Sequence, residues 1–171
     1  IPTIRSEPRK PDPYHKIRSN VYREEDRPVV KITRLNAQQC GCERIPNKAG
    51  CKNWKCQNRG MQMECNSKFC AYGASCRNLR FQKKEYARVK VTYMGKSGFG
   101  LLAKENISRG QFVLEYCGQV IGPEVREQRL MEGKKTKRFY LMQLNSSQTV
   151  DATEYGNVAR FVNHSCDPNC E

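Results

Sequence analysis

A cluster of cysteines between residues 40 and 76 constrains this chain more than any other feature of its sequence. Seven of the ten cysteines fall in this segment, and they follow the spacing C-x-C-x8-C-x4-C-x8-C-x4-C-x5-C. Little apolar sequence lies between them, so the segment cannot bury enough surface to fold on hydrophobic contacts alone. We therefore expect cross-links, either disulfides or metal ions, to stabilise it.

Metal ions are favoured over disulfides. Seven cysteines leave one thiol without a disulfide partner, and residues 1–5 lack the apolar block of a secretory signal. Zn²⁺ takes four thiolates in a tetrahedral structural site, so two ions need eight ligands unless one cysteine bridges both. The count predicts a binuclear zinc cluster. Its role is structural, because an all-thiolate shell leaves no open position for a substrate.

Charge is distributed unevenly along the chain. The chain has 31 basic and 17 acidic residues, and residues 1–85 carry a net charge of +11 whereas the remainder carries +3. Such a surplus favours a polyanion such as nucleic acid, although a merely solvated surface is an open alternative. Residues 1–34 contain five prolines among scattered charges, a composition that predicts an extended basic arm.

The second half of the chain has the pattern of a β-rich domain. Alternating or branched residues predict strands over 87–93, 111–116 and 139–144, and 94–98 is typical of a turn. A single helix is expected from Pro123 to Gly133, because proline is favoured in the first turn and glycine often ends a helix. The expected fold class is β-rich α+β, built from small sheets.

Few residues suit acid–base or phosphate chemistry. No phosphate-binding glycine loop is present, and the two histidines, His15 and His164, have no defensible serine or cysteine partner. Residues 97–100 (Ser-Gly-Phe-Gly) could let a ligand approach the backbone closely, but a simple hairpin turn is the commoner explanation of such a sequence. No apolar run approaches the ~18 residues of a membrane-spanning helix, so a membrane partner is not expected.

Four short motifs follow the cysteine cluster in a specific order. They are Gly98-Phe99-Gly100, Glu115-Tyr116-Cys117-Gly118, Val150-Asp151-Ala152 and Arg160-Phe161-Val162-Asn163-His164-Ser165-Cys166. Together with the cluster, they resemble a SET-domain protein lysine methyltransferase that carries an associated-with-SET (AWS) zinc module, in the NSD, absent-small-homeotic and Set-two group. After the basic arm that composition predicts at 1–34, the resemblance implies an AWS module at 35–85 and a SET fold of small sheets with a pseudoknot at 86–171, without the C-terminal end of SET and the post-SET segment.

The resemblance also implies a function. It is methyl transfer from S-adenosylmethionine to a lysine of a histone tail, with histone H3 lysine-36 as the target. The implied partner is the histone H3 tail in the nucleosome, and the charge surplus of the basic N-terminal half adds nucleosomal DNA as an expected partner. The implied location is the nucleus and chromosome, and we expect a monomer. Two alternatives remain open. One is a non-catalytic zinc-binding module that interacts with chromatin or nucleic acid, and the other is an interaction scaffold that zinc stabilises.

The resemblance also assigns the family's site residues to positions of this sequence. The resemblance places the catalytic groups at Tyr116 and Tyr140, and the cofactor contacts at Ser97, Gly98, Phe99, Arg138, Phe139, Tyr140, Arg160, Phe161, Asn163 and His164. It assigns one zinc ion to Cys40, Cys42, Cys51 and Cys56 and the other to Cys51, Cys65, Cys70 and Cys76, with Cys51 as the bridge. Cys166 would bind a third zinc ion only together with a post-SET segment. Two departures from the family are the four-residue gaps before Cys56 and Cys70 and the phenylalanine at position 99, where tryptophan is usual.

Overall fold

The structure of the chain is a computed structural model that describes residues 10–22, 38–136 and 138–171. The described residues form two compact units. One, the strand unit, consists of 10–22, 88–107 and 116–171, and the other, the cysteine unit, consists of 38–87 and 108–115. Of the expected basic arm, residues 1–9 and 23–34 lie outside the described residues.

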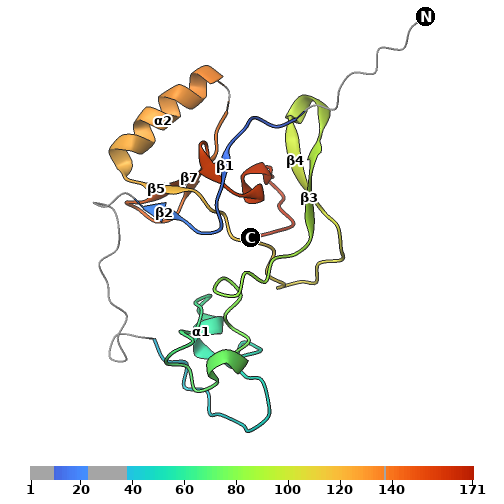
Figure 1. The fold of residues 1–171 in the computed structure, drawn as a ribbon, viewed down its shortest axis with the longest axis vertical. Coiled ribbons are helices and arrows are strands. Elements are labelled where there is room, and N and C mark those ends of the chain that lie inside the picture. Colours follow the sequence, from blue (N-terminus) through green and yellow to red (C-terminus); the bar gives the residue numbers. More distant parts are fainter. Residues whose placement is uncertain (1–9, 23–37, 137) are drawn as a thin grey trace, which may run out of the picture. The chain divides into compact units, whose positions relative to one another are not determined.

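The strand unit contains three small sheets (Figure 1). The largest has the order β2-β5-β7-β6, formed by Val21–Tyr22, Gln119–Ile121, Thr149–Asp151 and Leu141–Gln143. In the second, β3 (Val89–Tyr93) pairs antiparallel with β4 (Phe99–Ala103). The third pairs β1 (His15–Lys16) in parallel with β8 (Tyr155–Gly156). This arrangement confirms the expected β-rich fold of small sheets.

The described part of the N-terminal arm is built into the strand unit. Its strands β1 and β2 pair with β8 and β5, which lie more than 90 residues further along the chain. The Asn20 side chain accepts a hydrogen bond from the Gly118 backbone at 3.0 Å, and the Val21 backbone N–H donates to the Gly118 carbonyl at 3.0 Å. Residues 10–22 are therefore part of a folded unit rather than a separate arm.

The core of the strand unit lies around the ends of the central strands β5 and β7. Its buried side chains are those of Cys117, Val120, Ile121, Val150, Ala152, Ala159 and Phe161. The last two belong to the short 3-10 helix η3 (Val158–Phe161), whose first turn is capped by the Asn157 side chain. This core places η3 next to the sheet, and β4 also contacts η3.

The helix α2 (Pro123–Thr136) begins where the sequence predicts but extends three residues beyond Gly133. Gly133 is buried, and a Cβ there would stand 2.7 Å from the Phe139 ring. The glycine therefore serves close packing rather than helix termination. Figure 1 shows α2 beside the four-stranded sheet. An ion pair connects the two, because the Arg129 Nε of α2 lies 3.0 Å from the buried Asp151 carboxylate of β7.

The strand expected over 111–116 is not present. Residues 108–115 instead pack in the cysteine unit, where the Phe112 ring lies 4.4 Å from the Phe81 ring and 5.8 Å from the Tyr86 ring. Glu115 accepts hydrogen bonds from Lys84 at 2.7 Å and from the Tyr86 hydroxyl at 2.9 Å. Aromatic residues in this segment thus serve side-chain packing, which a strand pattern does not distinguish from sheet pairing.

The cysteine unit has little regular structure. Its helices are α1 (Gln57–Gly60) and the 3-10 turn η1 (Gly73–Ser75). Its buried core consists of Cys40, Cys51, Cys56, Cys65, Tyr72, Cys76 and Leu79. Tyr72 closes the loop before Gly50, because its hydroxyl donates to the Glu43 carbonyl at 2.7 Å and accepts from the Ile45 backbone at 3.2 Å. Cysteine is thus the main core-forming residue, as the sequence predicts.

Among the helices of the described ranges, none combines the length and the apolar character that crossing a lipid bilayer requires.

Gly118 is a position where the sheet leaves no room for a side chain. A Cβ there would stand 2.4 Å from the Asp151 carbonyl oxygen and 2.8 Å from a Val150 methyl group. Because the β7 backbone cannot move aside without losing its pairing, we expect Gly118→Ala to lower the free energy of unfolding by about 2 kcal/mol. Thermal unfolding measures this, with Gly122→Ala as the control, because a Cβ at Gly122 meets nothing within 4 Å. Equal stability of the two variants would contradict the packing described.

Candidate functional site

The first candidate site is the sulfur cluster of the cysteine unit. Two groups of four cysteines each bring their Sγ atoms within 4.8 Å of one another: Cys40, Cys51, Cys56 and Cys65, and Cys51, Cys65, Cys70 and Cys76. Individual Sγ–Sγ distances are 3.7 Å for Cys40 to Cys51 and 3.8 Å for both Cys51 to Cys70 and Cys56 to Cys65. Two tetrahedral sites that share ligands can be built from such groups.

These groups can be compared with the two ligand sets expected for the zinc ions. The second group consists of the same four residues as the expected second set. The first group contains Cys65 at the place where the expected set has Cys42. Cys42 is half-buried, packs against the cluster core and forms hydrogen bonds with Cys40 and Cys51. Both groups share Cys51, as expected, and they also share Cys65.

Burial opposes the ionisation of four of the seven clustered thiols. Burial raises the pKa of Cys51, Cys65 and Cys70, and together with Cys40 it raises the pKa of Cys42 to about 12. Cys40 differs from these four thiols, because hydrogen bonds with its neighbours outweigh burial and lower its pKa to about 7. Neighbouring thiolates repel one another unless a cation replaces their protons. The donor set therefore fits a thiophilic cation such as Zn²⁺.

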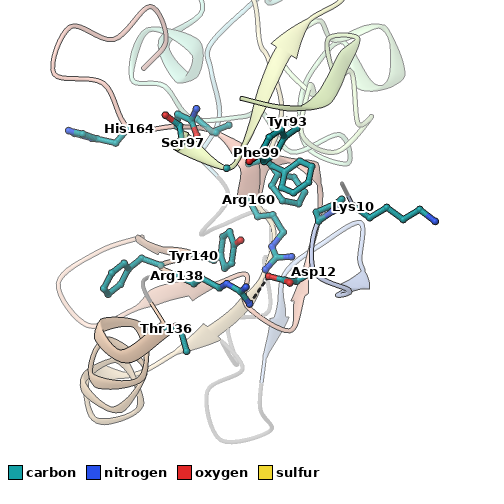
Figure 2. A pocket seen from close by; sticks show the side chains of 16 residues that line it. Lys10, Asp12, Tyr93, Ser97, Phe99, Thr136, Arg138, Tyr140, Arg160 and His164 are labelled. Carbon is teal, nitrogen blue, oxygen red and sulfur yellow. Dashed lines mark ion pairs between the residues drawn. The ribbon is translucent and has the colours of Figure 1, made fainter. Parts of the chain in front are cut away.

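The second candidate site is a cavity of about 730 Å³ in the strand unit (Figure 2). Its volume is within the range of small-molecule sites. All ten residues expected to contact the cofactor line it: Ser97, Gly98, Phe99, Arg138, Phe139, Tyr140, Arg160, Phe161, Asn163 and His164. They come from the turn before β4, from the segment between α2 and β6, and from η3 and the residues that follow it. The fold thus brings together three sequence motifs that are far apart along the chain.

The turn at one side of the cavity depends on two glycines. Gly98 has φ +74° and ψ −128°, a backbone conformation that a residue with a Cβ rarely adopts. At Gly100, a Cβ would stand 3.0 Å from the Asn163 side-chain nitrogen and 3.0 Å from a Met94 side-chain carbon. Glycine at position 100 therefore leaves the space that the Asn163 amide occupies beside β4.

Arg160 lies at the centre of an aromatic group in the cavity wall. Its side chain is 95% buried, and its guanidinium carbon lies 3.8 Å from the Tyr140 ring centroid, 4.4 Å from that of Tyr14 and 5.3 Å from that of Phe161. One guanidinium nitrogen donates to the Thr153 carbonyl at 3.1 Å. The other two, Nε and Nη1, are buried and have no hydrogen-bond partner among the described residues.

Tyr116, expected to be catalytic, is not among the residues that line this cavity. Its side chain is mostly buried, and burial raises its pKa above the usual value, although the charge of Arg160 acts in the opposite direction. The phenol is therefore protonated at neutral pH. Tyr140, the other expected catalytic residue, does line the cavity.

Three lining residues from the N-terminal segment were not expected from the sequence: Lys10, Pro11 and Asp12. The Asp12 carboxylate forms an ion pair with the Arg138 guanidinium, with an Oδ2–Nη1 distance of 2.7 Å (Figure 2). The other unexpected lining residues are Tyr93, Thr136 and Val162. The alternation over 87–93 places Tyr93 on the apolar face of its strand, and Thr136 belongs to a basic run that the sequence predicts to be solvated. No local pattern relates these residues to a shared cavity.

Cys166 belongs to the strand unit, whereas the seven clustered cysteines belong to the cysteine unit. It is exposed, and its Sγ lies 3.8 Å from the His164 Nε2. The metal-binding groups of the described residues do not include it. In Figure 2, the His164 side chain points away from the other labelled residues of the cavity.

Family comparisons agree with the order of the two sites along the chain. Residues 46–84 match the AWS domain, and residues 98–171 match the SET domain. The first match covers most of the sulfur cluster, and the second covers most of the residues that line the cavity.

Several curated proteins are similar to this chain. "Histone-lysine N-methyltransferase SETD2" from Homo sapiens is 38% identical over 91% of this chain, and "Histone-lysine N-methyltransferase, H3 lysine-36 specific" from Debaryomyces hansenii is 47% identical over 67% of it. "Histone-lysine N-methyltransferase ASHH1" from Arabidopsis thaliana is 44% identical over 68%. The chain spans 6%, 16% and 24% of the length of these three relatives, respectively.

Proposed function

Because this chain belongs to the SET-domain family and carries an AWS domain before its SET domain, we propose that it is the catalytic part of an S-adenosylmethionine-dependent histone-lysine methyltransferase that acts on histone H3 lysine-36. The observation that carries the proposal is that all ten expected cofactor residues line one cavity. The target lysine is inferred from relatives whose names specify H3 lysine-36.

The residues of the cavity fit the cofactor. Buried N–H groups without a partner are costly, and Arg160 presents two of them in the cavity wall. A carboxylate, such as the one at the amino-acid end of S-adenosylmethionine, would accept a hydrogen bond from one of these nitrogens. The Gly98 turn offers backbone groups at close approach, and Asn163 offers an amide. When bound there, S-adenosylmethionine supplies an electrophilic methyl group on a positively charged sulfur.

The lysine substrate requires positioning more than a strong base. A free lysine amine has a pKa of ~10.4, so the site has to favour its neutral form through burial and nearby positive charge. Tyr116 keeps its proton at neutral pH because burial raises its pKa. Its hydroxyl orients the amine through a hydrogen bond, and the rings of Tyr140 and Phe139 form walls of the lysine channel.

The cysteine unit binds zinc in this proposal. Two ions are held by the seven clustered cysteines, with Cys51 as the bridge, one by Cys40, Cys42, Cys51 and Cys56 and the other by Cys51, Cys65, Cys70 and Cys76. The shared membership of Cys51 in both sulfur groups supports this bridge. A third ion binds Cys166 only where a post-SET segment supplies further thiolates.

The proposed partners follow from charge and family. Residues 1–85 carry +11 and suit nucleosomal DNA, whereas the smaller surplus of the remainder, +3, leaves the catalytic part able to admit a basic histone tail. The protein would act as a monomer in the nucleus, on the chromosome. The basic half also favours a second candidate function, a non-catalytic zinc-binding module that contacts chromatin through DNA.

The test is labelled methyl transfer to recombinant nucleosomes by the whole protein. We expect label on histone H3 at lysine-36, and at least a tenfold loss with Asn163→Ala, because the amide beside β4 would contact the cofactor. Asn145→Ala is the matched control, since Asn145 lies in an exposed turn and its side chain bonds to its neighbours Ser147 and Gln148.

The outcomes separate the two candidate functions. Label that persists with Asn163→Ala contradicts the cofactor assignment. Absence of label with zinc-loaded wild-type protein, combined with salt-dependent binding to DNA, would favour the non-catalytic module.

A further inference from the structure

Two buried asparagines contact the sulfur cluster and have no part in the function proposed above. Asn58 and Asn78 are 0% and 1% exposed, and they belong to the most buried polar residues of the chain. Each lies two positions after a cluster cysteine, in the sequences Cys56-Gln57-Asn58 and Cys76-Arg77-Asn78. A buried amide is costly unless its N–H groups find acceptors, so their placement calls for a physical reason.

Both side-chain amides converge on the same sulfur. The Asn78 Nδ2 lies 3.5 Å from the Cys65 Sγ and 2.8 Å from the Met63 carbonyl oxygen. The Asn58 Nδ2 lies 3.7 Å from the same Sγ and 2.8 Å from the Gln38 carbonyl oxygen. An amide NH₂ has two hydrogens, so each asparagine can give one to a carbonyl and the other to sulfur.

The carbonyl contacts hold these amides in place. Gln38 and Met63 flank the cluster on different segments, and each fixes one N–H of its asparagine so that the other faces Cys65. The Asn78 backbone N–H also lies 3.3 Å from the Cys76 Sγ. The donors are therefore oriented toward the sulfurs of the cluster.

We propose that Asn58 and Asn78 are outer-shell positioning residues of the metal cluster, which stabilise Cys65 as a thiolate ligand by donating two N–H···S hydrogen bonds. This inference rests on the proposed binding of metal by the cysteine unit. Donors to an anionic sulfur favour the charged form and withdraw electron density from it. They also fix the direction of the Cys65 lone pairs, as outer-shell groups do in other metal sites.

The hydrogen bonds distinguish the two sulfurs that both groups share. A thiolate that bridges two ions commits two lone pairs to metal, and two further N–H donors would compete for the remaining density. Cys65, which accepts both amides, is therefore the terminal ligand of one ion. Cys51 is the bridge, because its sulfur lies between Cys40 of the first group and Cys70 of the second.

The experiment uses the whole protein with Asn58→Leu and Asn78→Leu, which keep the branching at Cγ but replace the donors by larger methyl groups. We expect each variant to transfer zinc to a coloured chelator at least tenfold faster than the wild type. In the cobalt-substituted protein, the sulfur-to-cobalt charge-transfer band is expected to move to longer wavelength, because a thiolate without hydrogen bonds gives up electrons more readily. Asn78→Ser, which is too short to reach the sulfur, should show the same shift.

Two controls separate this role from a general effect on folding. Asn53→Leu changes an exposed asparagine of the same unit, whose side chain accepts from Lys55. Tyr72→Phe removes hydrogen bonds to Glu43 and Ile45 from the same core without touching a sulfur donor. Both are expected to leave the charge-transfer band in place.

Unchanged zinc transfer and an unchanged band in the asparagine variants would overturn the inference while metal binding stands. A wild-type protein that binds neither zinc nor cobalt would instead overturn the proposed metal cluster itself. The two failures are therefore distinguishable in a single series of measurements.

Discussion

Cys51→Ser is expected to abolish the folding of the cysteine unit and to remove both zinc ions. Cys51 belongs to both sulfur groups, so its loss leaves each ion with three thiolates at most. The unit has few other sources of stability, because five of the seven residues in its buried core are cysteines. Structural zinc contributes ~10–16 kcal/mol per site in small modules, which exceeds the stability of most domains.

The measurement is metal content by mass spectrometry, together with limited proteolysis of residues 38–87. Cys170→Ser is the matched control, because Cys170 is exposed and lies outside the sulfur groups. It should retain two zinc ions and resist protease as the wild type does. A Cys51→Ser protein that keeps both ions and remains protected would contradict the bridging role.

Cys42→Ser, in the same experiment, tests which four cysteines bind the first ion. The family pattern includes Cys42, whereas the group of sulfurs that lie close together in the structure has Cys65 instead. Loss of one ion would support Cys42 as a ligand, in agreement with the family pattern. Retention of both ions would instead favour the group in which Cys65 takes that position.

Arg160→Ala is expected to have the second large effect, on both stability and cofactor binding. The guanidinium stacks on Tyr14, Tyr140 and Phe161 and donates to Thr153, so its removal leaves a void between rings and an unpaired carbonyl. Cation–π contacts contribute up to about 2 kcal/mol when desolvated, and we expect a net loss of about 3 kcal/mol. The affinity for S-adenosylmethionine should fall at least tenfold.

Thermal unfolding and calorimetric titration with S-adenosylmethionine check the two parts of this expectation. Arg138→Ala is the comparison, because its ion pair with Asp12 is exposed and contributes little to stability. That variant should weaken cofactor binding but unfold at nearly the wild-type temperature. An Arg160→Ala protein with wild-type stability and wild-type affinity would show that the buried guanidinium has neither role.

Local sequence signals predicted the elements that depend on neighbouring residues. The strand β3 and the turn after it, the start of α2 at Pro123 and the strand β6 follow from alternation, proline preference and branched residues. The extra turn of α2 beyond Gly133 could not be predicted, because the reason for that glycine is the Phe139 ring packed against it. For the same reason, residues 111–116 had a strand pattern but form aromatic contacts in the cysteine unit.

The residues of the candidate sites also fall into those that the sequence indicated and those that only the structure revealed. Motif order indicated all ten of the expected cavity residues, because their types and spacing are specific to a family. It did not indicate Asp12 or Lys10, since their place at the cavity follows from the pairing of β1 with β8, about 140 residues away. Asn58 and Asn78 were also missed, although each follows a cysteine at the same spacing.

The sequence by itself determined that seven clustered thiols stabilise one unit and that the family motifs define a β-rich SET domain. Cysteine count, spacing and motif order are properties of the chain, independent of its path in space. Only the tertiary structure decided which sulfurs share a group, which amides face Cys65 and which residues surround Arg160. These outcomes depend on contacts between distant segments, where a shift of one or two ångströms makes or breaks a hydrogen bond or a metal ligand.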